Sequence, residues 1–173
     1  MKLNSCALAM RLGFQVIAVC AASLVLSAQE APAAAPPSSA FDTSAETALN
    51  AMRARAGELH IRGVAVVAYA QGDNVTSWSS RMQVIGIMTQ PPSANDKGSN
   101  LLGIAYAKAA EMAATLKDSG SGIRPPLTGE FGWQGGVVAR GRTGILIAAF
   151  SGGRSEDDVN VSRAGLAVLA QSL

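Results

Sequence analysis

The chain has 173 residues, which is the length of one domain, and its formal net charge is +2. Two basic residues, Lys2 and Arg11, lie in the N-terminal segment, and removing them leaves 12 basic side chains against 12 acidic ones. A net charge near zero in the remaining chain excludes the electrostatic footprint of nucleic-acid binding, so no nucleic-acid partner is expected.

Residues 1–28 have the three regions of a secretory signal peptide. Lys2 and Arg11 precede an apolar run from Leu12 to Leu26, and small residues follow it. We expect cleavage near Ala28, and therefore a periplasmic or secreted protein. A retained membrane anchor is the alternative, although the apolar run is short for a membrane-spanning helix.

Both cysteines, Cys6 and Cys20, belong to this leader, so the mature chain can form neither a disulfide nor a reactive thiolate. The residues just before Cys20 are not those expected of a lipidated cysteine. Residues 29–40 are rich in proline and alanine, which predicts a disordered tether. The folded domain is then expected over residues 41–173, long enough for a single core.

The domain is predicted to begin with an amphipathic helix near Phe41 or Thr43. Thr43 and Glu46 have the spacing of a capping box. The helix is followed by VAVVAYA, Val64 to Ala70, which predicts a strand with apolar side chains on both faces. The turn QGDN and a more polar strand from Val75 to Val84 complete a predicted hairpin. The predicted apolar stripe of the helix consists of Ala45, Leu49, Met52, Ala56 and Leu59.

Two long loops surround the next predicted helix. Residues 85–100 are rich in proline, glycine and polar side chains without periodicity, and loops of this length are usually functional or mobile. The helix runs from Leu101 to about Lys117 and is rich in small residues. A second long loop covers residues 118–132. Val137 to Ala139, the turn RGR and the run TGILIAAF then predict a second hairpin.

The C-terminal stretch FSGGRSEDDVNVSRAGLAVL could be a phosphate cradle, a metal site or a capped helix. Acidic side chains in the first helical turn oppose a bound phosphate, and consecutive helical residues do not converge on one metal ion. We therefore predict a helix with Ser155 as N-cap and Asp158 in the capping-box position. Its predicted buried stripe is Val159, Ala164, Leu166 and Leu169.

These elements predict an α+β domain, with helices packed on an antiparallel sheet in the order helix, hairpin, helix, hairpin, helix. Strands that are apolar at consecutive positions need cover on both faces. Three modest helices are expected to cover only part of such a sheet, so we predict a homo-oligomer in which neighbouring subunits bury the rest.

Four motifs in this order resemble the haem-binding GlcG-like and HbpS-like family, which includes the C-terminal domain of PduO-type proteins. They are GVAVVAYAQGDN, IAYAKAAEMAATL, FGWQGGVV and SGGRSEDDVNVSRAGLAVL. The resemblance implies a profilin-like fold, a ring-like oligomer and haem as cofactor, with haem degradation or redox sensing in some members. The chain departs from the family in a longer segment between Met82 and Leu101. It also has Asp118, Ser119 and Gly120 in place of the Pro-Thr-Ser segment that helps to form the family's haem pocket.

A haem site needs an apolar slot, cations for the propionates and usually an axial ligand. His60, the single histidine, is better explained as a residue at the end of a helix. Lys108 could equally be a solvated lysine. Tyr106 is better explained as a buried tyrosine with a satisfied hydroxyl, and Met112 falls on a helical stripe and is expected in the core. Trp133 could line a pocket or form an oligomer contact. Met88 is predicted as the freest sulfur ligand, and Lys108 and Arg124 as clamps for the propionates. Tyr106 is predicted to ligate the iron or stack on the ring. Met112 and Ser119 complete the predicted haem-binding residues.

Two functions remain open from the sequence. The first is an exported protein for haem capture, storage or redox sensing. The second is a non-haem accessory or sensor-partner domain that binds a small organic acid, with a membrane sensor as a possible partner. It is favoured by the small number of possible axial haem ligands and by Arg124 in a glycine-rich loop. No nucleophile elbow, histidine cluster or pair of carboxylates in an apolar pocket points to an enzyme. Any catalysis would come from a bound cofactor.

Overall fold

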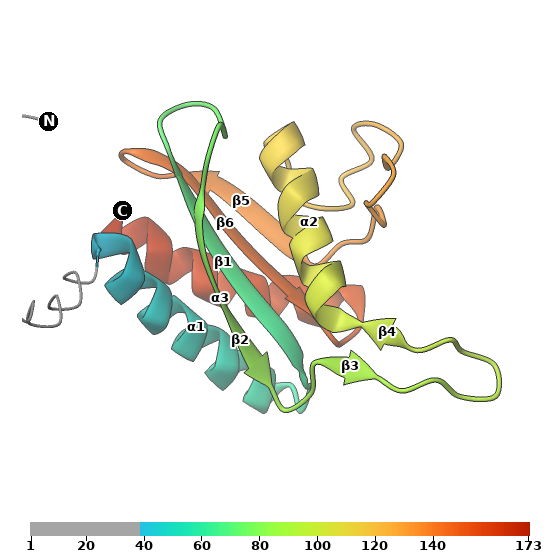
Figure 1. Ribbon diagram of the computed structural model, residues 1–173. Coiled ribbons are helices and arrows are strands. Elements are labelled where there is room, and N and C mark those ends of the chain that lie inside the picture. The colour runs from blue at the N-terminus through green and yellow to red at the C-terminus, as the bar shows by residue number, and fades with distance from the viewer. Residues whose placement is uncertain (1–38) are drawn as a thin grey trace, which may run out of the picture. The chain divides into compact units, whose positions relative to one another are not determined.

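The computed structural model describes residues 39–173, and the predicted leader and nearly all of the predicted tether lie outside the described residues. The strands β2, β1, β6 and β5 form one sheet in that order, with every neighbouring pair antiparallel (Figure 1). A separate small hairpin joins β3 to β4. The predicted α+β class is therefore confirmed. The elements in chain order are α1 (Ala40–Glu58), β1 (Gly63–Gln71), β2 (Ser79–Ile85), β3 (Thr89–Gln90), β4 (Ser99–Asn100), α2 (Leu101–Thr115), β5 (Gly136–Arg140), β6 (Gly144–Ser151) and α3 (Ser155–Ser172).

The sheet lies between two helical layers. Helices α1 and α3 pack on one face and α2 packs on the other (Figure 1). Alternation along β1 divides its side chains between two cores, with Ala65 and Val67 facing α1 and α3, and Val64 and Val66 facing α2. All residues of β6 are buried, because this central strand is covered on both sides.

The expectation that the helices leave part of the central sheet uncovered is wrong. On the face that α2 occupies alone, partly buried side chains beside the helix complete the cover, among them Val75, Trp78, Leu116 and Val138. Residues 63–68 of β1 and all of β6 are thus buried within one chain. An uncovered sheet face therefore gives no support to the predicted homo-oligomer, and association of subunits would need a different contact surface.

Helix α1 starts earlier than the sequence suggested. Ser39 is its N-cap, and the capping box joins the Ser39 side chain to the backbone N–H of Asp42, whose carboxylate accepts from the Ser39 backbone. The predicted box of Thr43 and Glu46 is wrong, because Ser39 and Asp42 offer the same spacing one turn earlier. The predicted stripe is confirmed at Ala45, Leu49, Met52 and Ala56, which are buried, while Leu59 is the C-cap residue.

The first hairpin has a longer connection than the predicted turn. Tyr69 is the last residue of β1 that pairs with β2, opposite Ser79, and β1 then continues to Gln71 paired only with β6. The second strand therefore starts at Ser79 instead of Val75. The predicted loop that follows contains β3 and β4. Residues 86–100, which we call the arm, project from the body of the domain in Figure 1, and residues 88–97 are exposed throughout.

Helix α3 has a different buried face from the predicted one. Its N-cap is Arg154, which makes no side-chain capping bond, so the predicted box of Ser155 and Asp158 is wrong. The helix instead packs closely on α1 at Gly165, where an added Cβ would lie 2.6 Å from Met52 Sδ. Of the predicted stripe only Leu169 is fully buried. The buried residues of α3 are Asp158, Val161, Ser162, Gly165 and Leu169.

Candidate functional site

A buried ion pair joins α2 to α3 at the predicted site. Lys108 and Asp158 each expose 3% of their surface. The Lys108 Nζ atom donates to Asp158 Oδ2 at 2.8 Å and to the Phe150 carbonyl oxygen of β6, also at 2.8 Å. One ammonium group therefore connects three elements from distant parts of the chain.

Asp158 is held from two sides. Its Oδ1 atom accepts the backbone N–H of Gly153 at 2.8 Å, which explains why its side chain turns inward instead of capping the helix. Burial raises the pKa of the Asp158 carboxyl, and the adjacent Lys108 charge acts in the opposite direction. The pair is thus a costly group to bury unless both partners are present.

Two consecutive glycines form the wall beside this pair. The Gly135 carbonyl oxygen accepts from the Phe150 backbone N–H at 3.0 Å and from Ser162 Oγ at 2.7 Å. A Cβ on Gly135 would lie 2.2 Å from Lys108 Nζ, and one on Gly136 would lie 2.4 Å from Met112 Cε. Only glycine lets the backbone approach these side chains so closely.

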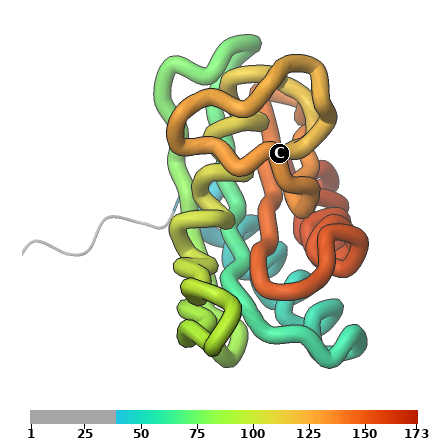
Figure 2. Tube along the Cα trace, turned by 90° about the vertical axis from the view of Figure 1, so that its right-hand side faces the viewer, coloured from blue at the N-terminus to red at the C-terminus, as the bar shows by residue number. Residues whose placement is uncertain are grey.

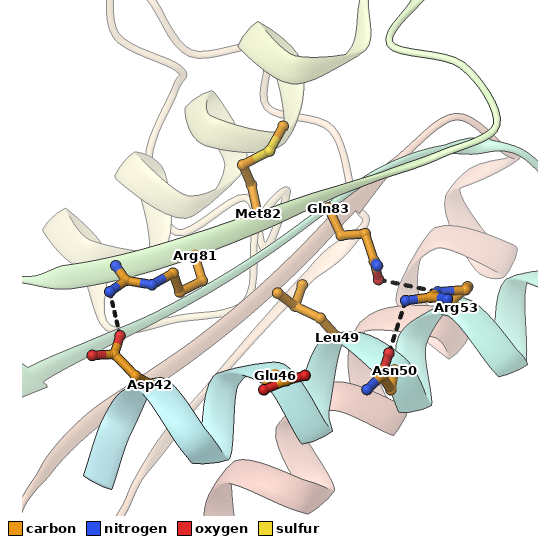
Figure 3. Close-up of a pocket in the computed structure, with 8 residues that line it drawn as sticks. All are labelled: Asp42, Glu46, Leu49, Asn50, Arg53, Arg81, Met82 and Gln83. Atoms are coloured by element: carbon orange, nitrogen blue, oxygen red, sulfur yellow. Dashed lines mark hydrogen bonds and ion pairs between the residues drawn. The ribbon is translucent and has the colours of Figure 1, made fainter. Parts of the chain in front are cut away.

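The space next to the pair is small. A cavity of about 120 Å³ is lined by Lys108 and Asp158 together with Gln90, Ile104 and Trp133, among others. Sites for drug-sized ligands usually have about 300 Å³ or more, so this cavity does not hold a porphyrin. Larger hollows lie elsewhere, one of about 400 Å³ beside Trp78 and α2, and one of about 600 Å³ between α1 and β2 (Figure 3).

The loop of residues 118–135 is held in place by its own ion pair. Arg124 binds Glu130 with two hydrogen bonds, NH1 to Oε2 at 2.6 Å and NH2 to Oε1 at 2.7 Å. The Arg124 hydrogen bond lowers the pKa of Glu130 to about 2, with help from the Leu127 backbone N–H. Buried Glu111 of α2 anchors the loop by accepting the Gly120 N–H at 2.9 Å.

This loop exposes large apolar side chains. Phe131 and Trp133 lie with ring centroids 4.8 Å apart and are 46% and 51% exposed. Ile123 and Leu127 are exposed on the same loop. In Figure 2, which views the molecule from the side to which the arm points, the loop crosses the top and the arm lies below it. Trp133, at the end of the loop, lines a cavity together with Gln90 of the arm.

No family model matches the sequence, and no curated protein matches it. Among solved structures, the fold is similar to the crystal structure of a PduOC:haem complex. The two chains share 16% sequence identity with a TM-score of 0.54, and the match covers 73% of this chain and 91% of that one. The likeness supports a fold related to the PduO C-terminal domain.

The six predicted haem residues do not form one site within the chain. Lys108, Met112 and Ser119 converge on Gly135 and Gly136, but all three are buried, and Ser119 Oγ accepts the Gly136 N–H at 2.8 Å. These three side chains form part of the packing and leave no slot for a porphyrin ring.

The other three predicted residues lie apart from that cluster. Arg124 is paired with Glu130. Tyr106 is half-buried, with its hydroxyl 3.4 Å from Ser80 Oγ, and Met88 is 46% exposed at the base of the arm. His60 is exposed at the end of α1, in a left-handed conformation with φ 55°.

None of the helices between residues 39 and 173 is long and apolar enough to cross a membrane. Within the same range, no three residues among the histidines and acids gather as metal ligands.

The pairing of Asp158 with Lys108 was not predicted from the sequence. A signal was present in the sequence, because Lys108 lies in a helix of small apolar residues, and a lysine buried in such a helix needs an anion. The three candidate acids of α3 could not be ranked without knowing which face of that helix is buried. Nothing comparable in the sequence indicated that Glu111 binds the Gly120 N–H or that Glu130 pairs with Arg124.

Proposed function

We propose that this protein is an exported haem-binding protein that captures, stores or senses haem, with a profilin-like fold of the GlcG-like and HbpS-like kind. The observation that carries the proposal is the likeness of its fold to a haem-complexed PduOC domain over 91% of that domain. The four sequence motifs point in the same direction.

The six residues predicted from the sequence do not fit a haem as a set, because Lys108 and Arg124 are each neutralised by a carboxylate and Met112 and Ser119 are buried. Another part of the surface fits better. Phe131 and Trp133 supply exposed aromatic rings, and Met88 supplies an exposed thioether two residues before Gln90, which lines a cavity with Trp133.

On this proposal a haem lies against the aromatic rings of the loop, with Met88 as the sulfur ligand. Lys97 on the arm is exposed and has no ion-pair partner among residues 39–173, which leaves its ammonium group available to a propionate. Haem would bring redox chemistry to the site, and the protein's own residues would bind and orient it.

Hemin titration of the purified mature protein tests the proposal. We expect a saturable Soret shift that ends near one haem per subunit. Met88→Ala should change the shape and position of the Soret band, because it removes the proposed ligand. Met112→Leu is the matched control, since it replaces a buried methionine with a side chain of similar volume and should leave the band unchanged. A wild-type titration without saturation would contradict the proposal.

Export is a separate part of the proposal, supported by the leader-like segment 1–28. Mass spectrometry of the protein recovered from outside the cytoplasm should give a mass that lacks this segment. A recovered mass that includes Met1 to Ala28 would show that the leader is retained.

The organic-acid alternative depended on the small number of possible axial haem ligands and on Arg124 as a cation for a ligand. The bidentate contact with Glu130 occupies that guanidinium, so this alternative loses its proposed cation.

A further inference from the structure

Ser151, the last residue of β6, carries a buried hydroxyl group without a protein partner. Only 4% of this residue is exposed, and its side chain makes no hydrogen bond to any residue from 39 to 173. Alternation along β6 places the side chain on the face of Ile147 and Ala149, where α2 packs. There Ser151 lines the cavity of about 120 Å³ beside Lys108 and Asp158. Because buried polar groups are normally hydrogen-bonded, this hydroxyl needs a partner in the cavity.

Lys108 has hydrogen-bonding capacity left at the same cavity. Its ammonium group carries three N–H donors. Two of them are used, by the Phe150 carbonyl oxygen and by Asp158 Oδ2, each at 2.8 Å. The third has no acceptor among residues 39–173. Two side chains that are each more than nine-tenths buried, Lys108 and Ser151, therefore line one cavity with unused donors.

The exposed mouth of the cavity is also polar. Gln90 and Ser99 pair across β3 and β4 near the base of the arm, and Gln134 lies at the end of the loop of residues 118–135. Within residues 39–173 none of these three side chains makes a hydrogen bond. A glutamine amide offers both N–H donors and a carbonyl acceptor. A ligand in the cavity can thus accept hydrogen bonds at the floor and form them in both directions at the mouth.

The charges around the cavity favour an uncharged ligand. The carboxylate of Asp158 neutralises Lys108, and Asp157 and Glu156 add negative charge in the first turn of α3, where Arg154 pairs with Asp157. An anion in the cavity would be repelled by these carboxylates. A cation would lie against the Lys108 ammonium group. Burying a charge without its own counterion is costly, so an uncharged polar molecule fits best.

The volume of the cavity limits the size of its ligand. A water molecule takes about 30 Å³ in the liquid, so the cavity holds a molecule of about four to six non-hydrogen atoms. We propose that it binds a small uncharged amide, whose carbonyl oxygen accepts from Lys108 and Ser151 and whose N–H groups donate to the glutamine side chains at the mouth. This inference does not depend on haem, which is too large for the cavity.

Acetamide is the test ligand, titrated into the mature protein without hemin and followed by NMR of the backbone amides. The signals of Gly152 and Gly153, which line the cavity, should shift saturably. A ligand of this size should have a dissociation constant of about 1 mM or above. Acetate has the same number of non-hydrogen atoms but carries a charge, so it should bind about tenfold more weakly or not at all.

Replacement of Ser151 tests the location of the site. Ser151→Ala removes one hydrogen bond and should weaken acetamide binding by about threefold to tenfold. Ser151→Val fills part of the cavity with a branched side chain that strands accept readily, and it should abolish the saturable shift.

Ser44→Ala is the matched control. Ser44 is a buried serine of α1, on the other face of the sheet, and its hydroxyl donates to the Ala40 carbonyl oxygen at 2.9 Å. Acetamide should bind this variant as it binds wild type. Circular dichroism should show native helix content for all three variants.

Three results would overturn the proposal. Wild type without a saturable shift up to about 100 mM acetamide would show that the cavity binds no such ligand. Acetate that binds as tightly as acetamide would contradict the uncharged class. Unchanged affinity in both Ser151 variants would place the bound amide elsewhere on the molecule.

Discussion

At the scale of single residues, Lys108 and Asp158 form an ion pair in which both side chains are buried. A buried ion pair contributes little compared with apolar residues of the same size, but removal of one partner leaves an uncompensated charge. The pair therefore adds little to the net free energy of folding, but each partner is needed because the other is buried.

Asp158→Ala should lower the free energy of unfolding by about 3–5 kcal/mol, since Lys108 then stays buried without its anion. The double replacement Lys108→Met/Asp158→Leu should be far less destabilising, because no charge is left to desolvate. Urea unfolding of the three proteins measures both effects. A double variant as unstable as Asp158→Ala would show that the ion pair itself supplies the stability.

Glu130 gives a pH prediction at the same scale. Its pKa falls from an ordinary 4.5 to about 2 in the folded protein, chiefly through the hydrogen bonds from Arg124. A carboxyl with a lowered folded pKa contributes stability above its unfolded pKa, and that contribution is lost as the pH falls from about 4.5 through about 2.

Glu130→Gln should therefore show a shallower loss of stability across this acid range than wild type does. Thermal melts at a series of pH values measure the slope, and NMR of the Glu130 side-chain carboxyl reads the pKa directly. A Glu130 resonance that titrates near its ordinary value would show that the Arg124 contact is weak in solution.

At the scale of elements, the contact between α1 and α3 depends on Gly165. An added side chain would meet Met52, which is fully buried and has little room to move. Gly165→Val should cost about 1–3 kcal/mol of overpacking.

Gly57 provides the control for that substitution. It lies in α1, and a Cβ there would meet nothing within 4 Å. Gly57→Ala should stabilise the protein by about 0.5–1 kcal/mol through helix propensity alone. Differential scanning calorimetry of both variants measures the two changes in stability. Equal effects on stability would show that α1 and α3 do not pack as closely as described.

At the scale of the whole molecule, the predicted elements were largely correct, because apolar runs such as those of β1 and β6 and the stripe of α1 are local patterns. Helix starts were predicted less well, since Ser39 and Thr43 both offer a capping box and only the packing decides between them. The buried face of α3 could not be predicted, because it consists of Asp158, Ser162 and Gly165, which become buried only through contacts with distant parts of the chain.

The site was harder to predict for the same reason. The resemblance pointed to a fold that the comparison supports, whereas the individual haem residues depended on which side chains remain accessible after folding. Lys108 and Arg124 are cations in the sequence, but each is neutralised by a carboxylate that lies far away along the chain or across a loop. Phe131, Trp133 and Met88 remain among the exposed apolar side chains.

On our proposal haem binds at the exposed surface of Met88, Phe131 and Trp133 and not at the buried Lys108 pair. Crystals of the mature protein grown with hemin, measured at the iron absorption edge, test this most directly. We expect one anomalous iron peak per subunit, beside Met88 and Trp133. An iron peak against Lys108 and Ser119, or loaded crystals with no iron peak at all, would contradict it.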